Sequence, residues 1–308
     1  MKKLISLLIA IMVLAAMLAS CANTGTSGTS GTTAPIVKVT PKNYKATEYL
    51  DGVLTFYIPK FHKDEANYLQ TLTGSKDRVY EDEEKLGTTM EVKITGETYD
   101  LPYKESRTGD AYNHSIIDRY VAYIEEFNKD LTVEYNRSLN RITAMYSMPG
   151  ESGHSITRDE ALKKAQALLK SQLNSASEYE VDYENERTND TYYFSFVRVV
   201  KGIKTNETAS VAINFDGTVN AYKFGCMGAF DGVDLSGLDM DAVNGVIKEK
   251  ADKIYEGYTY EITESNFTVI RKADGSFVLD FALRVDVSGN EYGDDIVKDR
   301  MSLFIYLE

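Results

Sequence analysis

The stretch that decides the predicted fold spans residues 155–173 and reads SITRDEALKKAQALLKSQL. Thr157 and Glu160 have the Ser/Thr-x-x-Glu spacing of a capping box, which begins many α-helices. Apolar residues then recur every three or four positions and form one stripe: Leu162, Ala165, Leu168, Leu169 and Leu173. Because this spacing matches the helical turn, the stretch predicts a helix that packs one face against another element.

After this helix the hydrophobic period changes to two, the period of a β-strand. Residues 179–183 and 211–215 alternate, and residues 192–200 are rich in aromatic and β-branched side chains. Asp216-Gly217 is typical of a two-residue hairpin turn, and residues 219–224 follow it as a returning strand. One helix followed by three or four antiparallel strands defines an α+β unit.

A second unit of similar order is expected from about residue 238. Asp239 or Ser236 is a candidate helix cap, and an apolar stripe follows: Val243, Val246, Ile247, Ala251 and Ile254. Strands are expected at residues 258–263, 267–271, 277–287 and 300–307, with Asp274-Gly275 as the matching hairpin turn. We therefore predict an α+β fold made of tandem units, each with one helix packed on an antiparallel three- to four-stranded sheet.

Residues before 150 are expected to form another α+β region. A hairpin is predicted over residues 89–101 and a strand meander over residues 121–146. Residues 64–72 and 115–124 are helix candidates, although the second range also fits a strand. The expected organisation is a signal peptide (1–20), a lipidated cysteine and tether (21–35), an N-terminal α+β domain (36–150) and two units (151–230 and 231–308).

Three segments carry a resemblance to a known family. These are the capped helix at residues 155–165, the strand and Gly turn YFSFVRVVKGI at 193–203, and the strand SVAINFDGTV at 210–219. Together they resemble PepSY-like domains over residues 155–224, and residues 238–308 resemble them more loosely. The resemblance implies a noncatalytic role, such as restraining a peptidase or binding a partner at the cell surface. It supplies no catalytic residues, and we expect the target to be a separate protein.

The N-terminus resembles a bacterial lipoprotein signal. Lys2 and Lys3 precede a stretch, residues 4–18, that is apolar except for Ser6, and the string LAS at residues 18–20 leads to Cys21. This apolar run is short for a membrane span. The resemblance implies a diacylglycerol thioether on Cys21, cleavage before it, and anchoring to the outer face of the bacterial cytoplasmic membrane. The alternative is an ordinary secretory signal, or an uncleaved anchor, that contains a chance cysteine.

The residues after Cys21 are consistent with an anchor followed by a tether. Residues 22–34 are almost entirely Thr, Ser and Gly, a composition that favours a flexible chain with a reach of roughly 20 Å. The formal net charge of the chain is −13, and removal of Lys2 and Lys3 with the signal gives −13 − 2 = −15. An acidic surface of this kind argues against nucleic acid as a partner. It is compatible with a basic partner, a cation-rich cell wall or simple solubility.

Recognisable catalytic chemistry is absent from the sequence. The three histidines, His62, His114 and His154, lie in no pairing motif, and neither a zinc motif, a nucleophile elbow nor a phosphate-binding loop occurs. Cys226 is interpreted as a buried inert thiol rather than a nucleophile. We therefore expect no catalytic residues, no metal site and no cofactor.

One acidic cluster offers a calcium alternative. Asp231, Asp234, Asp239 and Asp241 surround two glycines, and oxygen ligands on a bent loop suit Ca²⁺. The order does not fit an EF-hand, and Asp239 is explained equally well as a helix cap.

The leading hypothesis is a noncatalytic surface lipoprotein that binds a protein partner, with modulation or inhibition of an extracellular peptidase as one form of that role. Two alternatives stay open. The first is an extracellular hydrolase that acts on cell-wall or exported material, and the second is a lipoprotein that binds a peptide or small ligand.

Overall fold

The computed structural model describes residues 36–50, 58, 60–62, 67–68, 79–94, 96–108, 115–125, 128–148, 155–187 and 191–308. The predicted signal peptide, Cys21 and the tether lie outside these residues, as do His114 and His154. Within the described ranges, neither α-helix has the length and apolarity needed to cross a membrane.

The described residues form mainly β-strands. The first nine strands are β1 (Val37–Lys38), β2 (Tyr44–Leu50), β3 (Asn67–Tyr68), β4 (Val79–Tyr80), β5 (Thr89–Ile94), β6 (Glu97–Thr108), β7 (Ile116–Ile124), β8 (Lys129–Asn136) and β9 (Arg141–Tyr146). They are followed by helix α3 (Arg158–Gln172), the 3-10 turn η2 (Ala176–Glu178), β10 (Tyr179–Arg187), β11 (Thr191–Val200), β12 (Ile203–Asn214), β13 (Val219–Gly225) and β14 (Val233–Asp234). The last elements are helix α4 (Met240–Ile254), β15 (Thr259–Arg271), β16 (Phe277–Ser288), η3 (Asn290–Tyr292) and β17 (Val297–Leu307).

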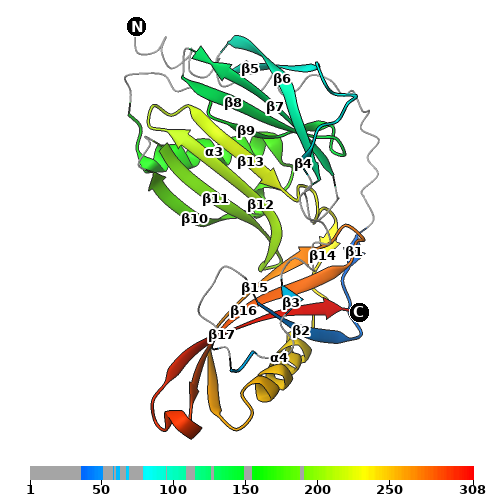
Figure 1. The fold of residues 1–308 in the computed structure, drawn as a ribbon, viewed down its shortest axis with the longest axis vertical. Coiled ribbons are helices and arrows are strands. Elements are labelled where there is room, and N and C mark those ends of the chain that lie inside the picture. Colours follow the sequence, from blue (N-terminus) through cyan, green and yellow to red (C-terminus); the bar gives the residue numbers. More distant parts are fainter. Residues whose placement is uncertain are drawn as a thin grey trace.

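Fifteen of these strands belong to one hydrogen-bonded network. Its main path runs β3-β2-β17-β16-β15-β12-β13-β9-β8-β7-β6-β4, with β10 and β11 attached through β12 and β5 attached to β6. Strands β4–β13 with α3 occupy the upper part of Figure 1, and β15–β17 with β2 and α4 occupy the lower part. A single parallel pair, Thr205 with Val269, joins the two parts.

The prediction of tandem units, each a helix on its own antiparallel sheet, was wrong. The protein is predominantly strand, and the described residues contain only two α-helices. Strands β9 and β13 pair through Met145 with Tyr222 and Ala144 with Lys223, so the N-terminal meander continues the sheet that α3 covers. Local periodicity predicts strands and hairpins, but it does not reveal which distant strand edges pair.

Several local predictions are confirmed. Helix α3 begins after the N-cap Thr157, and both hydrogen bonds of the capping box with Glu160 are present. Asp239 is the N-cap of α4, where it accepts from two backbone amides. Residues 115–124, where the sequence left helix and strand open, contain strand β7. Of the helix candidate at 64–72, only the strand residues 67–68 are described.

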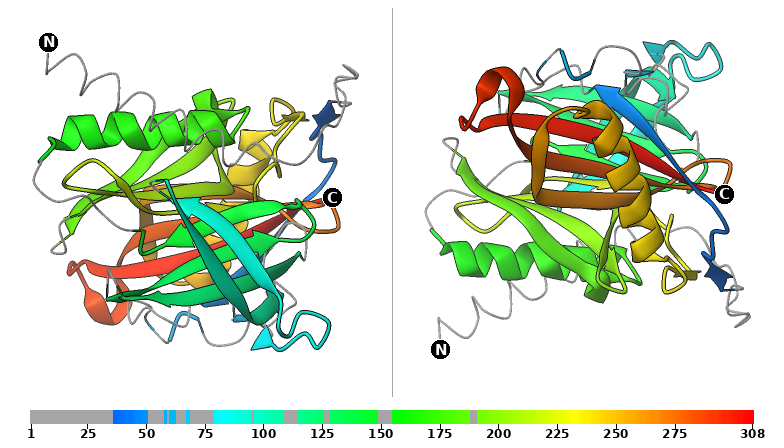
Figure 2. Two further views of the ribbon diagram at one scale, coloured as in Figure 1. Left: turned by 90° about the horizontal axis from the view of Figure 1, so that it is seen from above. Right: turned by 90° about the horizontal axis from the view of Figure 1, so that it is seen from below.

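Two hydrophobic cores hold these layers together. The first core lies between α3, the inner face of β11–β13 and the β5–β9 meander; Ala161, Ala165 and Leu169 of α3 are buried in it. The second core lies between α4 and the β15–β17 sheet, with Val243, Ile247 and Ala251 buried. Figure 2 shows α3 along one face of β10–β13 and α4 across one face of β15–β17.

The segment after residue 36 lies with the C-terminal sheet. Strand β1 pairs in parallel with β14, and β2 pairs in antiparallel fashion with β17. Gly237 lies so close to Val39 that an added Cβ would come within 2.4 Å of the Val39 carbonyl oxygen. Glycine is therefore required where this N-terminal segment crosses the chain that leads to α4. The predicted domain boundaries themselves stay a prediction.

Candidate functional site

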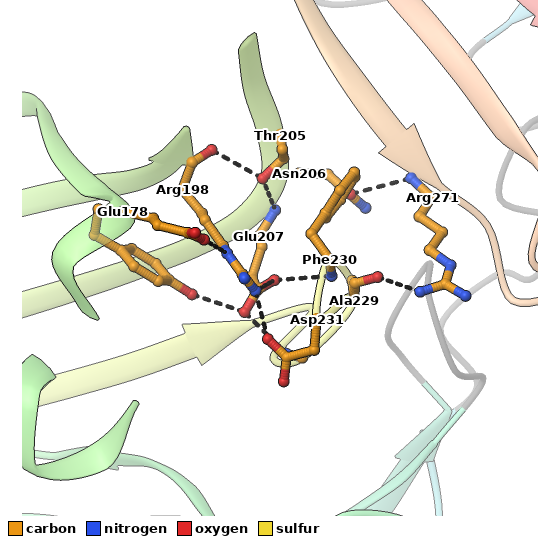
Figure 3. A network of polar contacts seen from close by, with 11 residues as sticks. Glu178, Arg198, Thr205, Asn206, Glu207, Ala229, Phe230, Asp231 and Arg271 are labelled. Atoms are coloured by element: carbon orange, nitrogen blue, oxygen red, sulfur yellow. Dashed lines mark hydrogen bonds and ion pairs between the residues drawn. The ribbon is translucent and has the colours of Figure 1, made fainter. Parts of the chain in front are cut away.

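A polar network surrounds the point where the two parts of the sheet meet (Figure 3). It involves the end of β11, the start of β12 and the loop at residues 226–232. These elements come together because β11 and β12 form a hairpin around Lys201 and Gly202, both of which have positive φ. Glycine tolerates this conformation at no steric cost, which explains its place in the turn.

Glu207 is the centre of this network. Its side chain is about 1% exposed. One carboxylate oxygen, Oε1, accepts hydrogen bonds from the Tyr179 hydroxyl at 2.9 Å and the Gly228 amide at 2.9 Å. The other, Oε2, accepts from Arg198 Nη1 at 2.8 Å and the Phe230 amide at 3.1 Å. A buried carboxylate with four donors is fully satisfied, so it fixes the 226–232 loop against the sheet.

Arg198 connects Glu207 with two further carboxylates, those of Glu178 and Asp231, which are more exposed than Glu207. Its Nε donates to Glu178 at 2.8 Å, and its Nη1 donates to Asp231 at 2.7 Å as well as to Glu207. Burial lowers the pKa of Arg198, but the charge of Glu207 and the hydrogen bonds to the three carboxylates outweigh it and raise the pKa. Burial, reinforced by Glu207, raises the pKa of Tyr179, which therefore stays a neutral donor.

A second set of bonds ties this network to the C-terminal sheet. Asn206 Oδ1 accepts from the Arg271 amide at 3.2 Å, and Asn206 Nδ2 donates to Cys226 Sγ at 3.3 Å. Arg271 Nη1 donates to the carbonyl oxygen of Ala229. Figure 3 shows Arg271 reaching toward the loop from the β15 side. These contacts give the network a structural role at the junction, and they place Cys226 half-buried within it.

The aspartates of the calcium alternative have separate partners. Asp231 pairs with Arg198, Asp234 accepts from the Ser236 amide at 3.0 Å, and Asp239 caps α4. In the ranges that the structure describes, no group of three or more His, Cys, Asp or Glu residues is arranged to hold a metal ion.

A second buried cluster contains the only described histidine. His62 Nε2 lies 2.8 Å from Asp299 Oδ2, and His62 Nδ1 contacts Glu48 Oε1. The Tyr255 hydroxyl donates to Asp299 Oδ2 at 3.0 Å, and the Ile58 amide donates to Asp299 Oδ1 at 2.8 Å. Burial lowers the pKa of His62, but its bonds to Asp299 and Glu48 raise it to about 9. The cluster thus consists of a protonated imidazole between two carboxylates.

This histidine cluster is closed to substrates. The side chains of His62 and Asp299 are 1% and 0% exposed, and that of Glu48 is 5% exposed. Sequence reasoning did not connect these residues, since 14 and 237 positions separate His62 from its two partners. The pairing of β2 with β17 brings Glu48 close to Asp299. No local sequence pattern predicts this pairing.

A third network lies inside the N-terminal meander. Asp118, which is fully buried, accepts from Ser106 Oγ at 2.7 Å and from Arg137 Nε at 2.9 Å. Arg137 Nη2 also donates to Asp82 at 2.6 Å, and Tyr103 shares a hydrogen bond with Ser106. Its members are internally matched, which suits a structural rather than a catalytic role.

Strand β15 has an open edge on the side away from β16. Residues 259–271 of β15 pair with β16, whereas β12 meets this strand only at Val269. Beside this edge lies a groove of about 630 Å³ between β15 and α4. Its lining comes from α4, from β15 with the preceding Tyr258, and from β16: Asn244, Ile247, Lys248, Asp252, Tyr258, Tyr260, Ile262, Ser265 and Leu283.

No protein-family model matches the sequence, and no curated protein matches it. The structure is similar to the Bacillus megaterium YpeB C-terminal domain, with a TM-score of 0.31, 10% identity, and coverage of 76% of this chain and 93% of that one. It is also similar to an uncharacterised protein from Eubacterium rectale, with a TM-score of 0.32, 11% identity, and coverage of 67% and 74%. TM-scores this low do not define a shared fold.

Proposed function

We propose that this chain is a noncatalytic lipoprotein, anchored through Cys21 at the outer face of a bacterial cytoplasmic membrane, that binds another protein. Within this proposal, residues 155–224 are a PepSY-like region and the partner is an extracellular peptidase whose activity the protein restrains. The anchor rests on the lipobox resemblance of residues 1–21, and the peptidase on the PepSY-like segments of the sequence.

The observation that favours binding over hydrolysis is the burial of the acid–base groups. A hydrolase needs a base or nucleophile that substrate can reach. In the described part of the chain, the histidine is enclosed by Glu48, Asp299 and Tyr255, and Glu207 is enclosed by four donors. Both groups therefore stabilise the fold. The open features are instead sheet edges and a groove, which are surfaces for contact.

The test combines an enzyme assay with identification of the partner. The mature lipoprotein should show no turnover of peptide, ester or glycan substrates. Crosslinking on intact cells should recover a secreted or membrane peptidase, and the activity of that purified peptidase should fall as the lipoprotein is added. The Cys21→Ala protein is the matched control, because it should inhibit equally in solution but lose the crosslink at the membrane.

One outcome would overturn the proposal. Reproducible hydrolysis that disappears when a single Asp, Glu, Ser or His is changed, with the circular dichroism spectrum preserved, would establish the hydrolase alternative.

A further inference from the structure

Strand β15 leaves a long stretch of its backbone open on one side. Between Thr259 and Thr268 its described pairing is with β16 alone. The side chains along this stretch are solvent-exposed at Glu261, Thr263, Glu264, Ser265 and Asn266. Backbone groups on such an edge can pair with an additional strand, which is a common mode of peptide recognition.

The groove beside this edge would receive half of the side chains of an added strand. Tyr260, Ile262 and Ser265 point to the α4 side, as shown by their pairing opposite the buried Val287, Val285 and Leu283 of β16. Successive side chains of a strand alternate between the two faces of a sheet. Every second residue of an added segment would therefore lie in the groove against apolar surface from Ile262, Ile247 and Leu283.

The remaining side chains would meet acidic residues. Glu261 and Glu264 lie on the opposite face of β15, where Glu264 forms an exposed ion pair with Arg284 at 2.9 Å. Charge complementarity therefore favours basic residues at the alternate positions of the added segment. A second copy of this chain is a poor occupant, because antiparallel pairing of two β15 edges would bring these glutamates together in a protein of net charge −13.

We propose that the open edge of β15 and its groove under α4 bind an extended segment of the partner protein in which apolar and basic side chains alternate. This inference rests on the proposed function, since it names the surface through which the protein binds its partner. The segment adds to β15 as an extra strand, with its apolar side chains in the groove and its basic side chains beside Glu261 and Glu264.

Strand β10 provides a matched control within the same molecule. It is also an edge strand, with a β-bulge between Val181 and Tyr183 that corresponds to the bulge between Ile262 and Glu264 in β15. Glu180 and Glu261 are both exposed and precede their bulges by the same number of residues. Carboxylates near both bulges have basic partners in this chain, since Asp182 pairs with Lys204, Glu184 with Arg158 and Glu264 with Arg284. The groove beside α4 lies along β15, so it distinguishes the two strands.

The binding test uses the full mature lipoprotein in detergent and a defined probe, an acetylated and amidated octapeptide of alternating lysine and valine. Amide hydrogen exchange should slow at residues 259–266 when the probe is added. Glu261→Lys should weaken binding about fivefold through charge reversal, and Ile262→Glu should weaken it at least tenfold because it places a charge in the groove. Glu180→Lys and Val181→Glu should leave the affinity unchanged. Without the probe, the circular dichroism spectra of all four variants should match that of the wild type.

A probe in which glutamate replaces lysine should bind at least tenfold more weakly. Equal binding of the two probes, or protection of β10 rather than β15, would overturn the inference.

A second experiment separates this inference from the function on which it rests. A photocrosslinking amino acid is placed at Ser265 or, as the control, at Tyr183, and the protein is expressed in its own cells. Crosslinks from position 265 alone, to a segment of another protein in which apolar and basic residues alternate, support the inference. Crosslinks from position 183 alone refute the β15 surface but leave the binding function standing. Recovery of a second copy of this chain from position 265 refutes the partner chemistry. Measured hydrolase activity without any protein crosslink would remove both proposals.

Discussion

Replacing Glu207 by alanine should be one of the most damaging changes in this protein, although Glu207 belongs to no catalytic arrangement. The carboxylate is buried beneath the 226–232 loop and receives four hydrogen bonds. The substitution would leave two backbone amides, those of Gly228 and Phe230, without their acceptor. It would also remove the buried partner of Arg198.

The magnitude follows from these losses. An unsatisfied buried donor costs about 1–3 kcal/mol, and removal of one partner of a buried ion pair costs about 3–5 kcal/mol. The two costs overlap because they arise from one carboxylate, and Arg198 keeps Glu178 and Asp231 as partners. We therefore expect Glu207→Ala to lower the free energy of unfolding by about 4 kcal/mol. Glu207→Gln, whose amide oxygen still accepts, should cost about 2 kcal/mol.

The assay is urea unfolding followed by far-ultraviolet circular dichroism. Asp231→Asn is the control, because the Asp231 side chain is 61% exposed and its ion pair with Arg198 should contribute less than about 1 kcal/mol. The ranking of Glu207→Ala above Glu207→Gln above Asp231→Asn tests the argument even if Glu207→Ala folds poorly. A loss below about 1 kcal/mol for Glu207→Ala, or an equal loss for Asp231→Asn, would refute the reasoning.

Three further predictions follow from other sites. The pKa of His62 is raised to about 9 from 6.5; its contribution should be fully present below pH 6.5 and disappear as pH rises through 9, a fall of about 3 kcal/mol in urea unfolding. His62→Gln should flatten this dependence of the free energy of unfolding on pH. Equal pH dependence in the wild type and the variant would contradict the prediction. Thr157→Ala should cost about 1 kcal/mol by removing the cap of α3, whereas Ser171→Ala on the same helix should cost less than about 0.5 kcal/mol. Cys21→Ala should abolish incorporation of labelled fatty acid, and labelling equal to wild type would exclude acylation at Cys21.

Local sequence signals predicted the local structure well. The spacing of Thr157 and Glu160 predicted the capping box, because both partners lie within one helical turn. Asp216 and Asp274 marked hairpin turns for the same reason: each side chain accepts from the backbone amide two residues later, at 2.8 Å and 2.9 Å. Such signals need only a few consecutive residues, so a single sequence is sufficient.

Such local signals could not predict which strands pair when they are far apart in the sequence. The paired residues Met145 and Tyr222 lie in strands whose alternating pattern is the same whether the strands end a sheet or continue one. Their pairing made one extended sheet from what the sequence divided into separate units. The buried polar groups show the same limit, since His62 meets Asp299 only after β2 has paired with β17. A charged residue in an alternating strand is expected to face solvent until its partner from elsewhere is known.

The buried polar network around Glu207 supports the strand whose edge is open. The network around Glu207 fixes the start of β12 and the 226–232 loop, and Arg271 links that loop to the end of β15. Strand β15 is thus held at its C-terminal end near Val269 and paired on one side by β16. The N-terminal half of β15 is left as a strand with one open edge on a supported sheet. Such an edge needs little reorganisation to accept another strand, which lowers the entropic cost of binding. The same buried charges that stabilise the junction therefore support the edge that we propose as the binding surface.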